Sequence, residues 1–135
     1  MNYVSGMVKE ISDCDGIAEV IFTDSAGVEY RSIVFDARDS KAYARRGARV
    51  CAAFKESELV LIKGSAKAVS ASNRIPGTIV SIQSGTVVSK IGLACGNDTF
   101  YVLLSSSSVS EMDISIGDSV TALVNATSIS FVPGR

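Results

Sequence analysis

The sequence of 135 residues contains no histidine and no tryptophan, and its only cysteines are Cys14, Cys51 and Cys95. Without histidine, Ser-His-Asp triads, Cys-His nucleophiles and the common zinc sites all lack an essential member. Three scattered cysteines are also too few for a disulfide framework or for a C-x-x-C metal site. We therefore expect that the protein is not an enzyme and that its cysteines are ordinary buried or half-buried thiols.

The chain also lacks an excess of positive charge. It has 13 basic and 14 acidic residues, which gives a formal net charge of −1. Binding to nucleic acid or to an anionic membrane usually requires a broad positive field, and single-stranded nucleic acid is also bound through exposed aromatic side chains. Because aromatic residues make up only 7% of the chain, we expect neither nucleic acid nor a membrane as a partner.

Long apolar runs are missing as well. The first residues, "MNYVSGMVKEISDCDG", include acidic groups and no apolar run of the length found in signal peptides. No segment approaches the roughly 20 apolar residues that cross a bilayer. Since 47% of the residues are nevertheless hydrophobic, the sequence predicts a compact globular protein, which we expect in the cytoplasm.

What the chain does contain is an internal repeat. The segment "NYVSG" at residues 2–6 returns as "NRIPG" at residues 73–77, an offset of 71, which also relates Tyr30 to Tyr101. Near the end of each half, "GARVCAAFKESEL" (47–59) matches "GDSVTALVNATSI" (117–129) with an offset of 70, so one residue is deleted in a loop between these points. Together with the small, polar linker "GSAKAVSAS" (64–72), this pattern predicts two repeats, 1–65 and 66–135.

Each half has the pattern of five short strands and one short helix. Alternation in "VSGMVKEI" and "GTIVSIQSG", and turn clusters such as "SDCDG", "DSAG" and "CGND", are typical of strands joined by hairpins. Segments 39–46 ("DSKAYARR") and 107–113 ("SSVSEMD") are long enough for only about two helical turns. The sequence thus predicts an all-β protein made of tandem five-stranded OB-type barrels, each with one short helix.

The second half resembles the Mop (molbindin, or TOBE) family of molybdate- and tungstate-binding domains. The stretch "SASNRIPGTIVSI" (70–82) follows the family's opening pattern S-x-R-N-x-x-x-G-x-[IV]-x-x-I. Then come Ser105 and Ser108 as a [TS]-x-x-S pair, "MDISIGDSV" (112–120), and "ALVNATSI" (122–129) in place of A-L-[IV]-K-A-S-S-[VI]. The order of these motifs over some 60 residues carries the resemblance.

In this family, molybdate or tungstate binds at interfaces between barrels, where the S-x-R-N arm of one unit meets the [TS]-x-x-S and K-A-S-S elements of another. A tetrahedral oxyanion only accepts hydrogen bonds, so hydroxyl, amide and backbone N–H donors can hold it without a positive net charge. We expect direct donation from Ser70, Ser105, Ser108 and the backbone at Ala126. The full oxyanion-binding set that the resemblance implies in the second repeat is Ser70, Ser72, Asn73, Ser105, Ser108, Asn125, Ala126 and Thr127.

The second repeat departs from the family pattern at both of its cations. Ser72 stands where the arm has arginine, and Asn125 stands where the later motif has lysine. Arg74 is a possible replacement, although strand alternation directs it to the face opposite Asn73. Two simpler interpretations also remain open: Asn73 caps nearby backbone, and "SSSS" (105–108) is a polar loop.

The first repeat departs further. Lys55 keeps the family's lysine, but Glu56 follows it and would repel a bound dianion. The positions of the hydroxyl pair fall in "VFDAR" (34–38), which has no hydroxyl group. The first repeat is therefore either structural or contributes Lys55 and Arg38 to a composite site.

The resemblance implies an oxyanion-binding protein for storage or homeostasis of molybdate or tungstate. The alternative is an effector-sensing module of a molybdate-responsive regulator or transporter, which works with a partner chain. If the donors come from different barrels, as the resemblance implies, an isolated chain cannot complete the sites, and two-repeat members of the family form trimers. We expect a homotrimer, with a dimer as the alternative.

Overall fold

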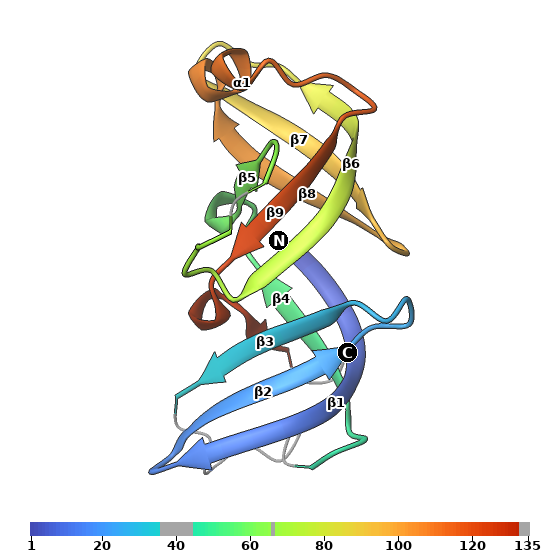
Figure 1. Cartoon of the computed structure of the whole chain (residues 1–135), viewed down its shortest axis with the longest axis vertical. Coiled ribbons are helices and arrows are strands. Elements are labelled where there is room, and N and C mark those ends of the chain that lie inside the picture. Colours follow the sequence, from blue (N-terminus) through green and yellow to red (C-terminus); the bar gives the residue numbers. More distant parts are fainter. Residues whose placement is uncertain (36–44, 66, 133–135) are drawn as a thin grey trace.

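The chain forms two five-stranded antiparallel sheets, which follow one another along the long axis of the molecule (Figure 1). The computed structural model describes residues 1–35, 45–65 and 67–132. Its elements are β1 (Asn2–Cys14), β2 (Ile17–Thr23), β3 (Glu29–Val34), β4 (Arg49–Phe54), η2 (Glu56–Glu58), β5 (Val60–Ile62), β6 (Asn73–Gln83), β7 (Val88–Cys95), β8 (Asp98–Ser105), α1 (Ser106–Met112), β9 (Ser119–Val124), η3 (Ala126–Ser128) and β10 (Ser130–Phe131). The all-β fold expected from the sequence is confirmed.

The internal repeat is visible strand by strand. β1 and β6 begin with Asn2 and Asn73, and buried and exposed residues alternate in the same order along both. Each strand also carries a β-bulge at the same place, between Val8 and Glu10 in β1 and between Ile79 and Ser81 in β6. A bulge bends its strand and increases the local twist. Both sheets therefore curve at equivalent points.

The first hairpin of each repeat corrects one detail of the sequence comparison. Tyr30 pairs with Phe22 across the first hairpin, and the residue in the same position of the second hairpin is Phe100, not Tyr101. The deleted residue lies in the turn itself, which is Ser25–Ala26–Gly27 in the first repeat and Gly96–Asn97 in the second. Arg31 is consequently the counterpart of Tyr101, and the offset of 70 applies from this turn onward.

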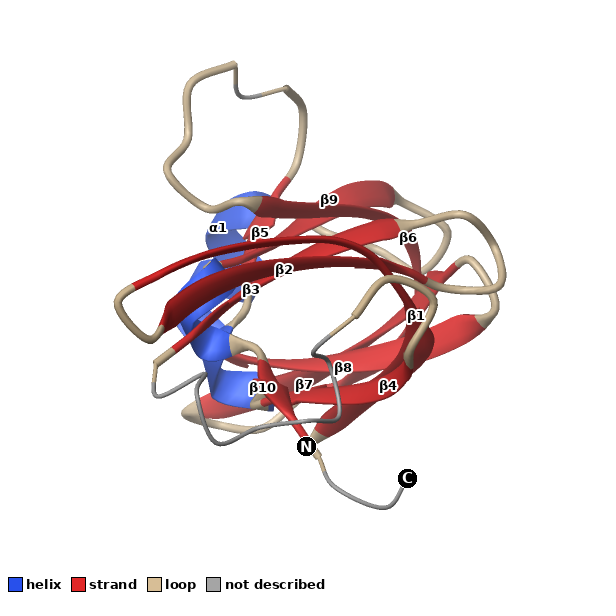
Figure 2. Cartoon of the chain, turned by 90° about the horizontal axis from the view of Figure 1, so that it is seen from below, coloured by secondary structure: helices blue, strands red, loops and turns tan. Residues whose placement is uncertain are grey.

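Each sheet takes its last strand from the other repeat. The sheet orders are β10-β4-β1-β2-β3 and β5-β9-β6-β7-β8. β5 thus pairs with β9 of the second repeat, and β10 pairs with β4 of the first. Viewed from below, strands of both sheets surround a common centre (Figure 2). The sequence boundary between residues 65 and 66 remains a prediction about the repeats, while the sheets cross it.

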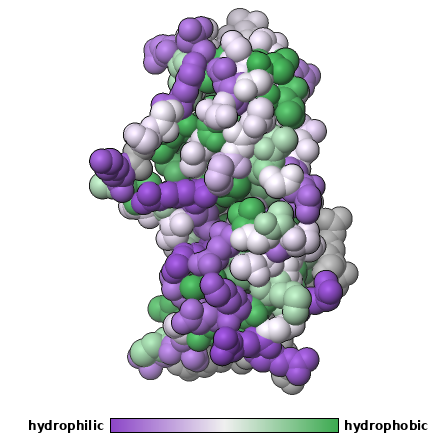
Figure 3. All heavy atoms as spheres, turned by 45° about the vertical axis from the view of Figure 1, so that its right-hand side comes forward, coloured by the Kyte–Doolittle hydropathy of each residue, from purple (hydrophilic) through white to green (hydrophobic). Residues whose placement is uncertain are grey.

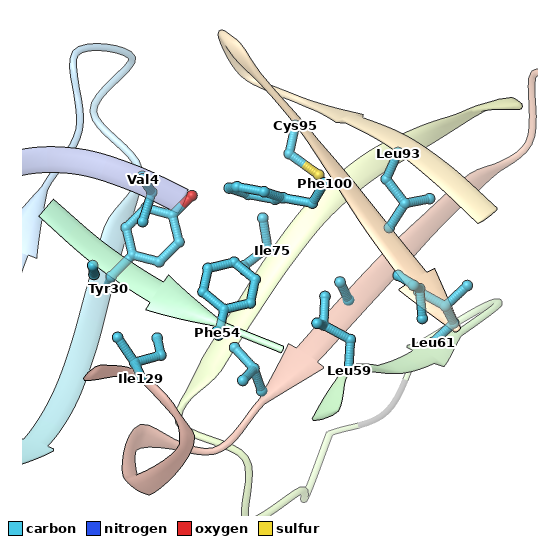
Figure 4. Packing of buried hydrophobic residues seen from close by; sticks show 14 of the residues in the cluster. Val4, Tyr30, Phe54, Leu59, Leu61, Ile75, Leu93, Cys95, Phe100 and Ile129 are labelled. Carbon is cyan, nitrogen blue, oxygen red and sulfur yellow. The ribbon is translucent and has the colours of Figure 1, made fainter. Parts of the chain in front are cut away.

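One hydrophobic core runs through both repeats. Figure 4 shows Phe54 of the first repeat beside Ile75 and Phe100 of the second. The rings of Phe54 and Phe100 meet edge to face with their centroids 5.0 Å apart, an arrangement that aromatic pairs favour. Leu59 and Ile129, which follow η2 and η3, are also buried in this cluster. Burial of apolar area is the main stabilising contribution to folding, so the two repeats stabilise each other.

The short helix expected near residues 107–113 is present as α1, in which Ser105 is the N-cap residue. Its expected counterpart at residues 39–46 falls mostly outside the described residues. Within the described ranges, no helix has the length and apolar character needed to cross a membrane. Hydrophilic side chains dominate the lower half of the face in Figure 3, whereas hydrophobic side chains reach the surface mainly in its upper half.

Candidate functional site

Asn73 joins the opening arm of the second repeat to the first sheet. Its Oδ1 accepts a hydrogen bond from the backbone N–H of Arg31 at 2.7 Å, and its Nδ2 donates to the carbonyl oxygen of Arg31 at 2.9 Å. Nδ2 also donates to the carbonyl oxygen of Val124 at 3.1 Å. The side chain is buried, so a carboxamide here satisfies three backbone groups that would otherwise be costly to bury.

Asn2 makes the same contact in the opposite direction. Its Oδ1 accepts from the backbone N–H of Tyr101 at 2.8 Å, and its Nδ2 donates to the carbonyl oxygen of Tyr101 at 2.9 Å. Arg31 and Tyr101 are counterparts on β3 and β8, the outermost strands of their sheets. Each asparagine therefore binds the backbone of one residue on the edge strand of the other repeat's sheet. Since both N–H groups of Asn73 are used in this way, Asn73 positions the arm.

The arm and η3 lie beside each other. The pairing of Asn73 with Val124 brings Ser72 alongside Asn125, the residue that precedes η3. From the first sheet, Ser32 Oγ donates to the carbonyl oxygen of Ile129 at 2.6 Å and so fixes the end of η3. Ala126 is buried. Among the described residues, no side-chain hydrogen bond forms at four exposed members of the predicted set: Ser70, Ser72, Asn125 and Thr127.

Ser105 and Ser108 lie elsewhere, at the start of α1. In Figure 1, α1 lies at the end of the second sheet that is far from the first sheet, whereas η3 lies where the sheets meet. Ser105 Oγ accepts from the backbone N–H of Ser108 at 3.1 Å and donates to Ser108 Oγ at 2.7 Å. The Ser105 hydroxyl thus forms the N-terminal cap of α1, and the Ser108 hydroxyl is its side-chain partner. A single chain does not bring this pair to the arm.

Arg74 follows the alternation expected for a strand. It is exposed while its neighbour Asn73 is buried, and its guanidinium donates weakly to the carbonyl oxygen of Val69 at 3.5 Å. Together with Pro76 and Thr121 it lines a hollow of about 280 Å³ on the outer surface. Arg74 therefore does not replace the arm arginine within one chain.

In η2, which is the first repeat's counterpart of η3, Glu56 makes two ion pairs. Its Oε1 lies 3.0 Å from Lys90 Nζ, and its Oε2 lies 3.3 Å from the amino nitrogen of Met1. The hydrogen bond from Lys90 holds the pKa of the Glu56 carboxyl below its ordinary value. Lys55 is exposed beside it, and Arg38 lies outside the described residues. Sequence reasoning identified Lys55 and Glu56 but missed Lys90, which comes from the other repeat and belongs to no motif.

Four titratable groups gather where the hairpin turns of the two repeats meet. The Tyr30 hydroxyl and Asp24 Oδ2 are buried without a hydrogen-bond partner among the described residues. Burial, and then Asp24, raise the pKa of Tyr30, while burial and Asp98 raise the pKa of Cys95 to about 11. Burial and then Asp24 also raise the pKa of Asp98. Phenol and thiol are thus neutral at pH 7, and among the described residues no group of three or more His, Cys, Asp or Glu side chains is placed to hold a metal ion.

The fold is a tandem pair of OB-type barrels, with exposed donors where the arm meets η3. Residues 69–131 match the family model described as TOBE domain. The second repeat is therefore similar to a TOBE domain, and the resemblance found in the sequence is confirmed for this half of the chain. Because this family consists of binding domains, the expectation that the protein is not an enzyme is also confirmed.

The solved structure of the cytoplasmic molybdate-binding protein ModG, with molybdate bound, is similar along nearly the whole chain. It has a TM-score of 0.90 and 23% sequence identity, and the match covers 96% of this chain and 94% of that chain. This similarity shows the fold. A comparison with curated proteins finds no match.

Two further solved structures match part of the chain. A molybdate-binding protein from Sporomusa ovata is 33% identical, with a TM-score of 0.43, over 44% of this chain and 90% of that chain. MopII from Clostridium pasteurianum is 28% identical, with a TM-score of 0.42, over the same shares.

Proposed function

We propose that this protein binds molybdate in the cytoplasm, with tungstate as a second ligand, and that it stores or buffers the oxyanion. The observation that carries the proposal is the exposed set of neutral donors where the arm meets η3, within a TOBE domain. Hydroxyl groups of Ser70, Ser72 and Thr127 and the amide of Asn125 all offer hydrogen atoms to an acceptor-only ligand. ModG, which shares the fold, is a molybdate-binding protein.

The remaining donors of the predicted site come from another copy of the chain. The helix α1, at whose start Ser105 and Ser108 lie, is far from the start of β6 and its arm (Figure 1), so an arm and a hydroxyl pair meet only between chains. Self-association would also cover apolar side chains that the second repeat exposes, namely Val80, Val87, Val88, Leu103 and Ile116. A homotrimer is our proposal, with a dimer as the alternative.

Isothermal titration with molybdate, tungstate and sulfate tests the proposal, with the mass in solution measured by light scattering. Saturable heat with molybdate and tungstate but not with sulfate is the expected result, on a protein three times the mass of one chain. A monomer that binds none of the three anions contradicts both the site and the assembly. A storage protein releases its ligand without a partner, whereas the alternative role as a sensing module requires a partner chain whose binding depends on molybdate.

A further inference from the structure

The two repeats present equivalent short turns, of which the first, η2, is acidic and the second, η3, is uncharged. η2 and η3 each follow the last long strand of their repeat by one residue, and the preceding residues, Lys55 and Asn125, have nearly the same backbone conformation (φ −76°, ψ 145° and φ −68°, ψ 145°). The first residue of the turn is Glu56 in η2 and Ala126 in η3. A carboxylate thus lies in the first repeat where the second has only a methyl group.

The cations of this region are concentrated around η2. Lys55 precedes the turn, and Lys90 reaches it from β7 of the other repeat. The counterpart of Lys90 in the first repeat is Glu19, whose carboxylate lies 3.6 Å from the guanidinium of Arg31. Two lysines therefore accompany η2, whereas the equivalent positions for η3 are a neutral amide, Asn125, and an acidic residue, Glu19.

Lys90 also lies over an aromatic ring. Its Nζ lies 4.8 Å from the centroid of the Tyr101 ring, a favourable position for a cation over an aromatic face. The backbone of Tyr101 is in turn held by Asn2. The Glu56 side chain is 21% exposed, the lowest value among the ion-paired side chains of the described residues. The carboxylate is thus positioned against Lys90 and mostly covered.

We propose that Glu56 is an intramolecular anion that occupies the first repeat's counterpart of the oxyanion site and so restricts binding to the second repeat. The inference rests on the proposed function, because it assumes that the region around η3 binds the oxyanion. A dianion approaching Lys55 and Lys90 meets a carboxylate that already pairs with Lys90, and the two anions repel each other. Removal of the carboxylate leaves two lysines around a small residue, and these can donate charge-assisted hydrogen bonds to an oxyanion.

The test compares Glu56→Ala with Glu58→Ala by titration with molybdate on the full chain. Glu58 lies on the same turn and is exposed, so the control changes the net charge equally. We expect Glu56→Ala to double the number of molybdate ions bound per chain, and Glu58→Ala to leave the number unchanged. Addition of Lys90→Gln to Glu56→Ala should remove the extra binding.

The outcomes separate this inference from the proposed function. Binding by the unaltered protein tests the proposed function, and the difference between the protein and Glu56→Ala tests the role of Glu56. An unchanged stoichiometry in a folded Glu56→Ala variant overturns the inference, even where the unaltered protein binds molybdate. An equal increase in Glu58→Ala also overturns it, because the effect is then one of net charge. Absence of binding in every variant overturns both.

Discussion

The carboxamide of Asn73 forms two hydrogen bonds with the backbone of Arg31, of 2.7 and 2.9 Å, and thereby links the start of one repeat to the sheet edge of the other. Asn2 and Tyr101 repeat this contact in the opposite direction. Because a carboxamide carries both an acceptor and donors, asparagine can bond to both backbone groups of one residue.

Replacement of Asn73 by aspartate should destabilise the fold strongly. The carboxylate cannot donate, so the buried carbonyl groups of Arg31 and Val124 lose their partners, and a buried charge is added. We expect the free energy of unfolding to fall by about 2–4 kcal/mol, measured by urea denaturation. Asn125→Asp, at an exposed position, is the control and should have little effect. Equal losses in the two variants would show that the contact is not important for stability.

Replacement of Ser72 by arginine should tighten molybdate binding. It returns the family's cation to the arm, next to Asn125, where a guanidinium forms charge-assisted hydrogen bonds to an oxyanion. We expect the dissociation constant to fall about tenfold, the equivalent of ~1.4 kcal/mol, as measured by isothermal titration. Ser12→Arg makes the same change of charge at the far end of β1. A dissociation constant that is unchanged in Ser72→Arg, or that falls equally in Ser12→Arg, counts against the assignment of the arm.

Replacement of Tyr30 by phenylalanine should stabilise the protein. The phenol is buried without a hydrogen-bond partner among the described residues, and its counterpart in the second repeat is already phenylalanine, at position 100. Removal of an unsatisfied buried hydroxyl should raise the free energy of unfolding by about 1 kcal/mol. Thermal and urea denaturation measure the change, and Tyr101→Phe, whose ring is exposed, is the control. A loss of stability in Tyr30→Phe would mean that the hydroxyl has a partner in solution.

The effect of the Asp98 carboxyl group on the free energy of unfolding should depend on pH. Burial and Asp24 raise the pKa of Asp98 in the folded protein, so the ionised side chain opposes folding. As the pH falls through this raised pKa, the folded state binds its proton before the unfolded state does, and the destabilisation is relieved. We therefore expect Asp98→Asn to be more stable than the unaltered protein at pH 7, and the difference to shrink toward acid pH.

Urea denaturation across this pH range measures the difference for Asp98. The control is Asp118→Asn, because a hydrogen bond from the backbone of Ser115 lowers the pKa of Asp118. This variant should instead be less stable at pH 7, and its deficit should shrink below the ordinary pKa of an aspartate. A pH-independent effect of Asp98→Asn would contradict the proposed cause.

The repeat could be found in the sequence because Asn2 and Asn73 begin strands with the same alternation of buried and exposed residues. The deletion was placed too late because Tyr30 and Tyr101 are the same residue type, although one is buried and the other exposed. The exchange of β5 and β10 was not predictable, since strands of three and two residues carry almost no periodic pattern.

The candidate site was only partly accessible from sequence. Motif order identified the arm and the segment at η3, and the pairing of β6 with β9 brings these two together. The hydrogen bonds between Asn73 and the backbone of Arg31, and the ion pair between Glu56 and Lys90, are contacts between the repeats. No local sequence pattern encodes them.

The strand exchange has a consequence during synthesis of the chain. The first sheet receives β10 only after residue 131 has been made, although its other strands end at Phe54. The first repeat therefore emerges from the ribosome with the edge of β4 unpaired. This edge stays open while more than half of the chain is still being translated. A second nascent copy on the same messenger RNA presents the same open edge, and the two copies can pair with each other before either has completed its own fold.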